Sequence, residues 1–207
     1  MKQDTDYKKK LLLLESAKKE FLEKGYNKAS LRDICANAGV TTGSLYFFFE
    51  NKAGLFSAIV DGPVRGLKKL LNDHFREDRE YMSRICDIDK IDMDHDDVTD
   101  AIVDYIYSNY DSFMLILNAS ENTMYENTID ELVDMTQKSI PMMIDKMPGY
   151  KTDEYMCHWM AHISIESFIN VIKHEKNVEV AKKRLRPIMN YLVQGWVTLT
   201  MIKEDKT

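Results

Sequence analysis

Glycine and proline are scarce in this chain, with 8 and 4 copies among 207 residues. A fold of many short strands needs a tight turn at each connection, and these two residues make most such turns. Their scarcity argues against an all-β protein. Thirteen methionines and few β-branched runs favour helices packed through flexible side chains. The expected fold class is all-α.

Cysteines and long apolar runs are also few. Cys35, Cys86 and Cys157 lie far apart and form no CxxC pair, a pattern typical of reduced thiols rather than of a disulfide framework. No apolar stretch approaches the ~18 residues that a membrane-spanning helix needs. Residues 1–10 lead into an amphipathic segment and not into the apolar stretch of a signal peptide. We therefore expect a cytoplasmic protein with no membrane partner.

Positive charge is lacking overall but not at the beginning of the chain. The net charge is −6, yet residues 1–70 hold 13 Lys+Arg against 8 Asp+Glu, and the remainder holds 15 against 26. A basic N-terminal third localises attraction for phosphate at one end of the protein. Ordinary solvated charge produces the same pattern, so charge alone does not decide the function.

Three helices are expected before residue 50. The first covers residues 5–24 and ends at Gly25. Its apolar stripe is Leu11, Leu14, Ala17, Phe21 and Leu22. A short helix over 31–38 has Ser30 as its N-cap and stops at Gly39, and a third, capped by Thr41, runs to Phe49.

A fourth helix begins near Lys52 with Asn51 as its cap, and Gly62-Pro63 should kink or interrupt it, because proline has no N–H to donate. Further helices are expected over about 98–118, 125–147, 152–175 and 178–202. The acidic stretch 87–97 is interpreted as a loop. A calcium loop is disfavoured, since its sixth position is Asp92 instead of glycine and its twelfth is Val98 instead of glutamate.

The pair of short helices has the features of a helix-turn-helix. Ala36 and Ala38 are small enough for a close helix crossing, Gly39 makes the turn, and Val40 supplies an apolar plug behind it. The second helix then begins with the small polar residues 41–44, which let its backbone approach a groove of DNA.

Contacts to DNA follow from the chemistry of this segment. The hydroxyls of Ser30 and Thr41 stand at helix N-termini, where partial positive charge suits a phosphate. Tyr46 and Lys52 offer two further phosphate contacts. Base contacts would come from Thr42, Gly43, Ser44 and Phe47. No arginine or lysine lies in this helix, so a bidentate contact with guanine is not expected.

The segment resembles the DNA-binding domain of the TetR (tetracycline-repressor-like) family over about residues 6–67. The matching positions are Phe21, Gly25-Tyr26, Ser30, Ile34, Ala38-Gly39-Val40, Gly43-Ser44-Leu45-Tyr46, Phe49, Lys52 and Leu55-Phe56. The resemblance implies the same DNA-facing set: Ser30, Thr41, Thr42, Gly43, Ser44, Tyr46, Phe47 and Lys52. Phe48 stands where many relatives carry histidine, so no contact is transferred to it.

For residues 68–207 the resemblance implies a helical domain that binds an effector and forms a homodimer through the last two helices. The sequence supports this pairing, because both helices are apolar on more than one face. In the penultimate helix these residues are Trp159, Met160, Ile163, Ile165, Phe168, Ile169, Val171 and Ile172. In the last they are Ile188, Met189, Leu192, Val193, Trp196, Val197 and Met201. A two-fold dimer matches a palindromic operator.

Polar groups and methionines on otherwise apolar helices indicate where an effector pocket would lie. The predicted lining is Met114, Asn118, Met143, Trp159, His162 and Glu166. Alternatively, His162 and Glu166 satisfy each other in the core or across the dimer. His158 and His162 have the spacing of a zinc chelate, but the glutamate of an HExxH motif is absent and Cys157 points away. No metal or cofactor is expected.

These observations predict a ligand-responsive transcriptional regulator, a repressor released from its operator by a small molecule. The alternative is an interaction protein that keeps the helix-turn-helix fold without specific DNA binding. An enzyme is not expected, because no nucleophile elbow, phosphate loop or metal signature organises the serines, histidines and aspartates.

Overall fold

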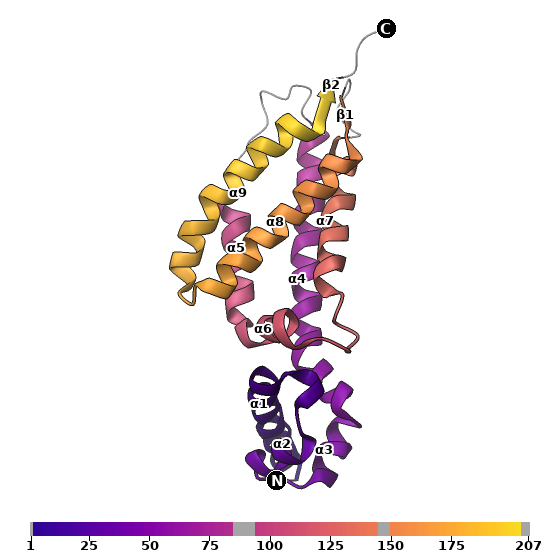
Figure 1. Ribbon diagram of the computed structural model, residues 1–207, viewed down its shortest axis with the longest axis vertical. Coiled ribbons are helices and arrows are strands. Elements are labelled where there is room, and N and C mark those ends of the chain that lie inside the picture. The colour runs from indigo at the N-terminus through magenta and orange to yellow at the C-terminus, as the bar shows by residue number, and fades with distance from the viewer. Residues whose placement is uncertain (1, 85–93, 145–149, 204–207) are drawn as a thin grey trace. The chain divides into compact units, whose positions relative to one another are not determined.

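The computed structural model describes residues 2–84, 94–144 and 150–203, with the backbone alone for residues 2, 3 and 196–203. The chain divides into two compact units. The first contains the residues up to Gly66 together with Asn109–Thr128, and the second contains Leu67–Ser108 and the residues from Ile129 onward. Helices dominate both units (Figure 1), so the predicted all-α class is confirmed.

The first unit consists of α1 (Lys2–Lys28), α2 (Leu31–Ala38), α3 (Thr42–Phe49), the beginning of α4 (Lys52–Met82) and α6 (Tyr110–Ala119). Gly25 interrupts the helical backbone of α1 with φ 74° and ψ 163°, a conformation that glycine adopts without strain. The domain prediction placed residues 109–128 in the second part of the chain. Here they join the first unit, where Asp111 lies 3.7 Å from the Lys18 ammonium.

The core of the first unit is aromatic at its centre. Phe21 and Phe56 are almost fully buried and meet edge to face with centroids 5.2 Å apart, and Tyr26 contacts both rings. The predicted stripe on α1 is right at Phe21 but wrong at Leu11 and Leu22, which are exposed. Two buried polar residues, Ser16 and Glu20, lie on the core side of α1 instead, and the Ser16 hydroxyl donates to the Ile34 carbonyl of α2.

Gly54 lies in the first turn of α4, and the end of α3 leaves no space for a side chain there. A Cβ atom there would stand 2.1 Å from the carbonyl oxygen of Phe49. We expect Gly54→Ala to destabilise the protein by about 2–3 kcal/mol, because the clash is with backbone and cannot be relieved by a rotamer change. Thermal denaturation followed by circular dichroism measures the loss.

Gly43→Ala is the matched control. Gly43 is an exposed glycine of α3, and an added Cβ would meet only the Thr41 hydroxyl oxygen at 3.8 Å. Alanine there should raise the stability by up to about 1 kcal/mol, because it favours the helix. Equal melting temperatures for the two variants would contradict the predicted clash.

Helix α4 runs without interruption through Pro63, so of the two predicted effects of Gly62-Pro63 the interruption is wrong, and the kink stays a prediction. A proline in a helix leaves the carbonyl four residues earlier without its usual donor. For Pro63 that carbonyl belongs to Ile59, and the buried Ser112 hydroxyl of α6 donates to it at 3.0 Å. A tertiary hydrogen bond thus replaces the missing helical one.

The second unit consists of the rest of α4 with α5 (Asp96–Ser108), α7 (Thr128–Ile144), α8 (Glu154–His174) and α9 (Val178–Thr200). The single helix predicted over 98–118 is two helices, α5 and α6, divided at Asn109. Two short strands, β1 (Tyr150–Thr152) and β2 (Met201–Lys203), pair antiparallel with Tyr150 opposite Lys203 and link the start of α8 to the end of α9 (Figure 1). These strands were not predicted.

Polar pairs at intervals of four residues join α5 to α9. The Asn190 amide donates to Asp96 at 3.0 Å, and the Lys182 ammonium lies 2.7 Å from Asp104. Between them, the Arg186 guanidinium bonds Asp100 through two nitrogens and holds the pKa of that carboxyl below its usual value. The two helices are therefore fixed in register.

No helix among the described residues is both long and apolar enough to cross a membrane. Cys35 and Cys157 are buried free thiols, and burial raises the pKa of each. Cys86 and most of the acidic stretch 87–97 lie outside the described residues.

Candidate DNA-binding surface and ligand cavity

Helix α3 presents one buried side and one exposed side. Leu45 is fully buried and Phe49 is 5% exposed, and both pack into the core of the first unit. On the other side, Tyr46 and Phe47 are 55% and 75% exposed. Large rings held on a surface by a short rigid helix are typical of a contact site.

The start of α3 is polar and accessible. The Thr41 hydroxyl oxygen accepts from the Ser44 backbone N–H at 3.3 Å and lies 3.1 Å from the Ser44 hydroxyl. Thr42 and Gly43 follow as exposed residues of the first turn. The N-terminus of α3, with its partial positive charge, is thus open to a ligand.

Helix α2 and the turn set the direction of α3. The Ser30 hydroxyl accepts from the Asp33 backbone N–H at 3.2 Å. Gly39 ends α2 at φ 65° and donates its N–H to Ala36 at 3.1 Å. The predicted caps of both helices are therefore confirmed.

A buried carboxylate joins α1 to the start of α2. Glu20 is 4% exposed, and its Oε1 accepts from the Ser30 backbone N–H at 3.1 Å and from the Lys24 ammonium at 2.7 Å. Both partners lie in the first unit. The carboxylate therefore fixes Ser30, the first of the predicted DNA-facing residues.

Basic side chains lie beside α3. Lys8 and Lys9 of α1 line one surface hollow together with Thr41 and Ser44, and sequence analysis did not include these lysines. Lys52 is half-buried, donates to the Asn27 carbonyl at 3.2 Å and lies 4.9 Å from the centre of the Tyr26 ring. Burial lowers the pKa of Lys52. The eight predicted DNA-facing residues thus lie on α3 or within a few residues of it in the sequence, apart from Ser30 at the start of α2.

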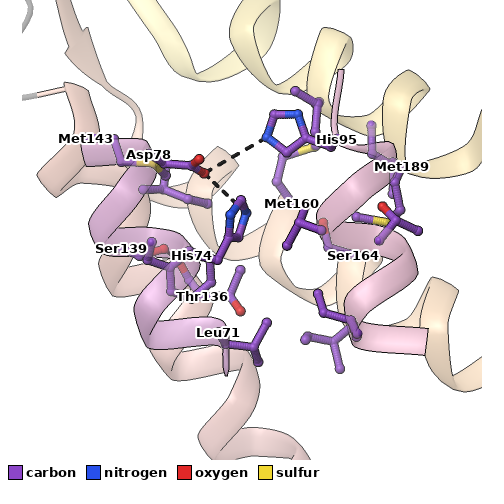
Figure 2. A pocket seen from close by; sticks show the side chains of 18 of the residues that line it. Leu71, His74, Asp78, His95, Thr136, Ser139, Met143, Met160, Ser164 and Met189 are labelled. Carbon is purple, nitrogen blue, oxygen red and sulfur yellow. Dashed lines mark hydrogen bonds and ion pairs between the residues drawn. The ribbon is translucent and has the colours of Figure 1, made fainter. Parts of the chain in front are cut away.

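The second unit contains a partly open cavity of about 390 Å³, lined by residues of α4, α5, α7, α8 and α9 and of the short segment before α5 (Figure 2). Most of its lining is apolar: Leu71, Phe75, Met82, Val98, Ile102, Ile140, Met143, Met160, Ile165, Phe168, Met189, Leu192 and Val193. The polar and aromatic remainder is His74, Asp78, Tyr81, Asp94, His95, Asp97, Thr99, Thr136, Ser139 and Ser164.

Three polar side chains of this lining converge. The Asp78 carboxylate oxygen lies 3.2 Å from His74 Nε2 and 4.0 Å from His95 Nε2. Figure 2 marks both contacts with dashed lines. Burial lowers the pKa of His74 and raises the pKa of Asp78. His74 and Asp78 are one turn apart on α4, a spacing visible in the sequence, but His95 comes from the segment before α5.

Of the six residues predicted to line an effector pocket, only Met143 is among those lining this cavity. Trp159, His162 and Glu166 are on α8, whose cavity side is formed instead by Met160, Ser164, Ile165 and Phe168. Glu166 is exposed, and the His162 ring lies 4.5 Å from that of His158.

Met114 and Asn118 are on α6 in the first unit, where the Asn118 amide donates to the Met114 carbonyl at 3.1 Å. The structure therefore does not bring the six residues together.

Two short helices joined by a glycine turn, with the second exposed along its polar side, define a helix-turn-helix protein. Residues 13–59 match the family described as "Bacterial regulatory proteins, tetR family". This segment is therefore similar to the DNA-binding domain of TetR-family regulators, as the resemblance in the sequence indicated.

The sequence match to a known relative is confined to a short part of the chain. The HTH-type transcriptional repressor BepR of Brucella suis biovar 1 (strain 1330) is 44% identical over 48 residues, 23% of each chain. The match to this curated relative therefore covers about a quarter of its length.

Solved structures resemble the whole fold. A transcriptional regulator (TerR/AcrR family) from Aquifex aeolicus VF5 has a TM-score of 0.61 at 18% identity, over 89% of this chain and 99% of that one. The SmeT–triclosan complex has a TM-score of 0.56 at 18% identity, over 94% and 92%. At this level of identity the likeness concerns the fold alone.

Proposed function

We propose that this protein is a ligand-responsive transcriptional repressor that binds palindromic operator DNA as a homodimer and leaves it when a small molecule binds. The observation that carries this proposal is the accessible start of α3, with Thr42, Gly43, Tyr46 and Phe47 exposed opposite a buried side. A helix of this shape fits the major groove of DNA. The role requires no enzymatic activity, and a bacterial regulator of this kind works in the cytoplasm.

Phosphate and base contacts divide among the side chains of the first unit. Ser30, Thr41, Tyr46 and Lys52 would bind phosphates, and Lys8 and Lys9 would add positive charge beside them. Thr42, Gly43, Ser44 and Phe47 would contact base edges, with the Phe47 ring against a thymine methyl group.

The effector would bind in the cavity of the second unit. Its volume of about 390 Å³ lies within the range of roughly 300–1,000 Å³ for small-molecule sites, and its lining is mostly apolar with a few polar groups. A structural relative, SmeT, has been solved as a complex with triclosan. Leu71 and His74 of the lining are on α4, the helix that begins in the DNA-binding unit, so a bound ligand could act on both units through α4.

The homodimer would form through α8 and α9. Both helices carry exposed apolar or aromatic side chains: Tyr155 and Trp159 on α8, and Ile188 and Tyr191 on α9. Solvent-exposed rings spaced along two adjacent helices suit an interface. The side chains of Trp196, Val197 and Met201, also predicted for this interface, lie outside the described residues.

We expect Tyr191→Glu to convert the dimer to monomers, because Tyr191 is 74% exposed in one chain and a charge there would be buried between two. Sedimentation velocity measures the mass. The matched control is Tyr7→Glu, which changes a tyrosine that is 63% exposed on α1 and should leave the mass unchanged. A wild-type chain that sediments as a monomer at micromolar concentration would overturn the dimer.

DNA binding is tested by fluorescence anisotropy with the fragment upstream of the protein's own gene and with a shuffled fragment of equal length. A repressor should bind the native fragment at least ~1,000-fold more tightly, with affinity falling steeply as salt rises. Equal affinity for both fragments would instead favour an interaction protein that keeps the fold without sequence-specific binding.

A further inference from the structure

His74, Asp78 and His95 bring three metal-binding side chains to one end of the cavity. One nitrogen or oxygen from each residue lies within 4.8 Å of the other two. His74 and Asp78 are four residues apart on α4, so both point to the same side of the helix, and His95 faces them from the segment before α5 (Figure 2).

Hydrogen bonding inside this cluster is incomplete. The 3.2 Å contact between His74 and Asp78 is short enough for a hydrogen bond, but the 4.0 Å contact between His95 and Asp78 is not. The other ring nitrogen of His95, Nδ1, is buried and has no partner among the described residues. A simple hydrogen-bonded network would leave His95 poorly satisfied.

The Asp78 carboxylate also has no lysine or arginine partner among the described residues. Among the described residues, the charged groups acting on the Asp78 carboxyl are the two imidazoles and the like-charged Glu77. A half-buried carboxylate that faces two imidazoles and no lysine or arginine is an environment in which a bound cation would supply the missing positive charge.

We propose that His74, Asp78 and His95 bind a divalent transition-metal ion, Zn²⁺ by its chemistry, with the remaining coordination position open to the cavity. Two imidazoles and one carboxylate are ligands that zinc prefers, whereas Ca²⁺ and Mg²⁺ prefer oxygen alone. Tetrahedral zinc with bonds of about 2.1 Å separates its ligand atoms by about 3.4 Å, so side-chain rotations of small size bring the three atoms to the required spacing.

The ion would stabilise the contact between α4 and the segment before α5, and its open position would accept a donor atom of a ligand in the cavity. Only the role of the ion in binding an effector rests on the proposed function. Zinc binding itself is a property of the second unit and is measured without DNA.

The test is equilibrium dialysis of the full-length, chelator-treated protein against Zn²⁺, with Co²⁺ absorption spectra as a second reading of the ligand set. The wild type should bind one ion per chain, and a large excess of Mg²⁺ should not displace it. His74→Gln, Asp78→Asn and His95→Gln should each weaken binding by on the order of 100-fold or more, since even the loss of an outer partner of a ligand costs 10–100-fold.

The matched control changes the other histidine pair, His158 and His162 on α8, whose rings are 4.5 Å apart. The double variant His158→Gln, His162→Gln should retain the ion. Zinc should raise the melting temperature of the wild type and of this control, but not of the three site variants, all of which are first shown to be folded by circular dichroism.

No stoichiometric zinc in the wild type, or zinc lost from the α8 variant and kept by the α4 variants, would overturn the proposal. Operator binding is measured on the same preparations. A chain that binds zinc but no operator refutes the proposed function and supports the metal site. A chain that binds its operator but no zinc refutes the metal site and supports the proposed function.

Discussion

Replacing Thr42 with glutamate should weaken operator binding on the order of 100-fold or more while leaving the protein folded, because like charges forced together at an interface cost several kcal/mol. Thr42 is the first residue of α3 and is exposed. A carboxylate there would enter the groove among phosphates. In the free protein the negative charge of this glutamate interacts favourably with the partial positive charge at the N-terminus of α3, so no loss of stability is expected.

The control places the same glutamate on an exposed position of the second unit, Asn72→Glu on α4. Both variants change the net charge equally, and only the change at Thr42 should affect the anisotropy titration at a fixed salt concentration. Operator affinity that falls equally in both would show that overall charge, and not the groove contact, determines binding. Unchanged affinity in both would remove α3 from the interface.

Glu20→Ala should destabilise the protein by about 2–3 kcal/mol, since it removes a charge-assisted hydrogen bond of a buried carboxylate and leaves the half-buried Ser30 N–H without its partner. Because Ser30 begins α2, the loss should be accompanied by weaker operator binding. Urea denaturation measures the free energy of unfolding, and the melting of the helical signal reports it independently.

Glu23→Ala is the matched control, since Glu23 is an exposed glutamate of the same helix and its removal should change the stability by less than about 0.5 kcal/mol. The free energy of unfolding of Glu20→Gln should lie between those of Glu20→Ala and Glu23→Ala, because the amide oxygen still accepts from the Ser30 N–H but carries no charge. A Glu20→Ala variant as stable as Glu23→Ala would show that the buried carboxylate contributes nothing to the fold.

The helix-turn-helix could be predicted from sequence because its determinants are local. Ser30, Gly39 and Asn51 act within three or four residues of themselves, through caps and turns, and each cap is present in the structure. The bounds predicted for α2 agree with those of the structure for the same reason.

The face of α1 that packs inward was harder to predict, because polar residues occupy it. Ser16 is buried and donates to the Ile34 carbonyl at 2.8 Å, and Glu20 bonds the start of α2. Apolar periodicity therefore favoured Leu11 and Leu22, and missed Leu13, which is fully buried. The partners that make a buried polar residue favourable come from another helix and leave no local pattern.

The cavity could be predicted only in outline for a similar reason. Met143 was found because a methionine on an otherwise apolar helix is a local signal. The approach of His95 to His74 and Asp78 depends on tertiary packing across about twenty residues of sequence. Residues on α8 were assigned to the cavity from the polarity of His162 and Glu166, whereas the helix turns Met160 and Ser164 toward it.

The hydroxyl of Ser112 has a mechanical consequence for α4. At Ile59 the helix lacks one of its own hydrogen bonds, and there it would bend most easily. Since α6 supplies the absent donor, the helix is stiffened at its weakest point, just before Gly66, where the first unit ends. Loss of the Ser112 hydroxyl would leave the Ile59 carbonyl without this donor, and the helix would then bend more easily at Pro63.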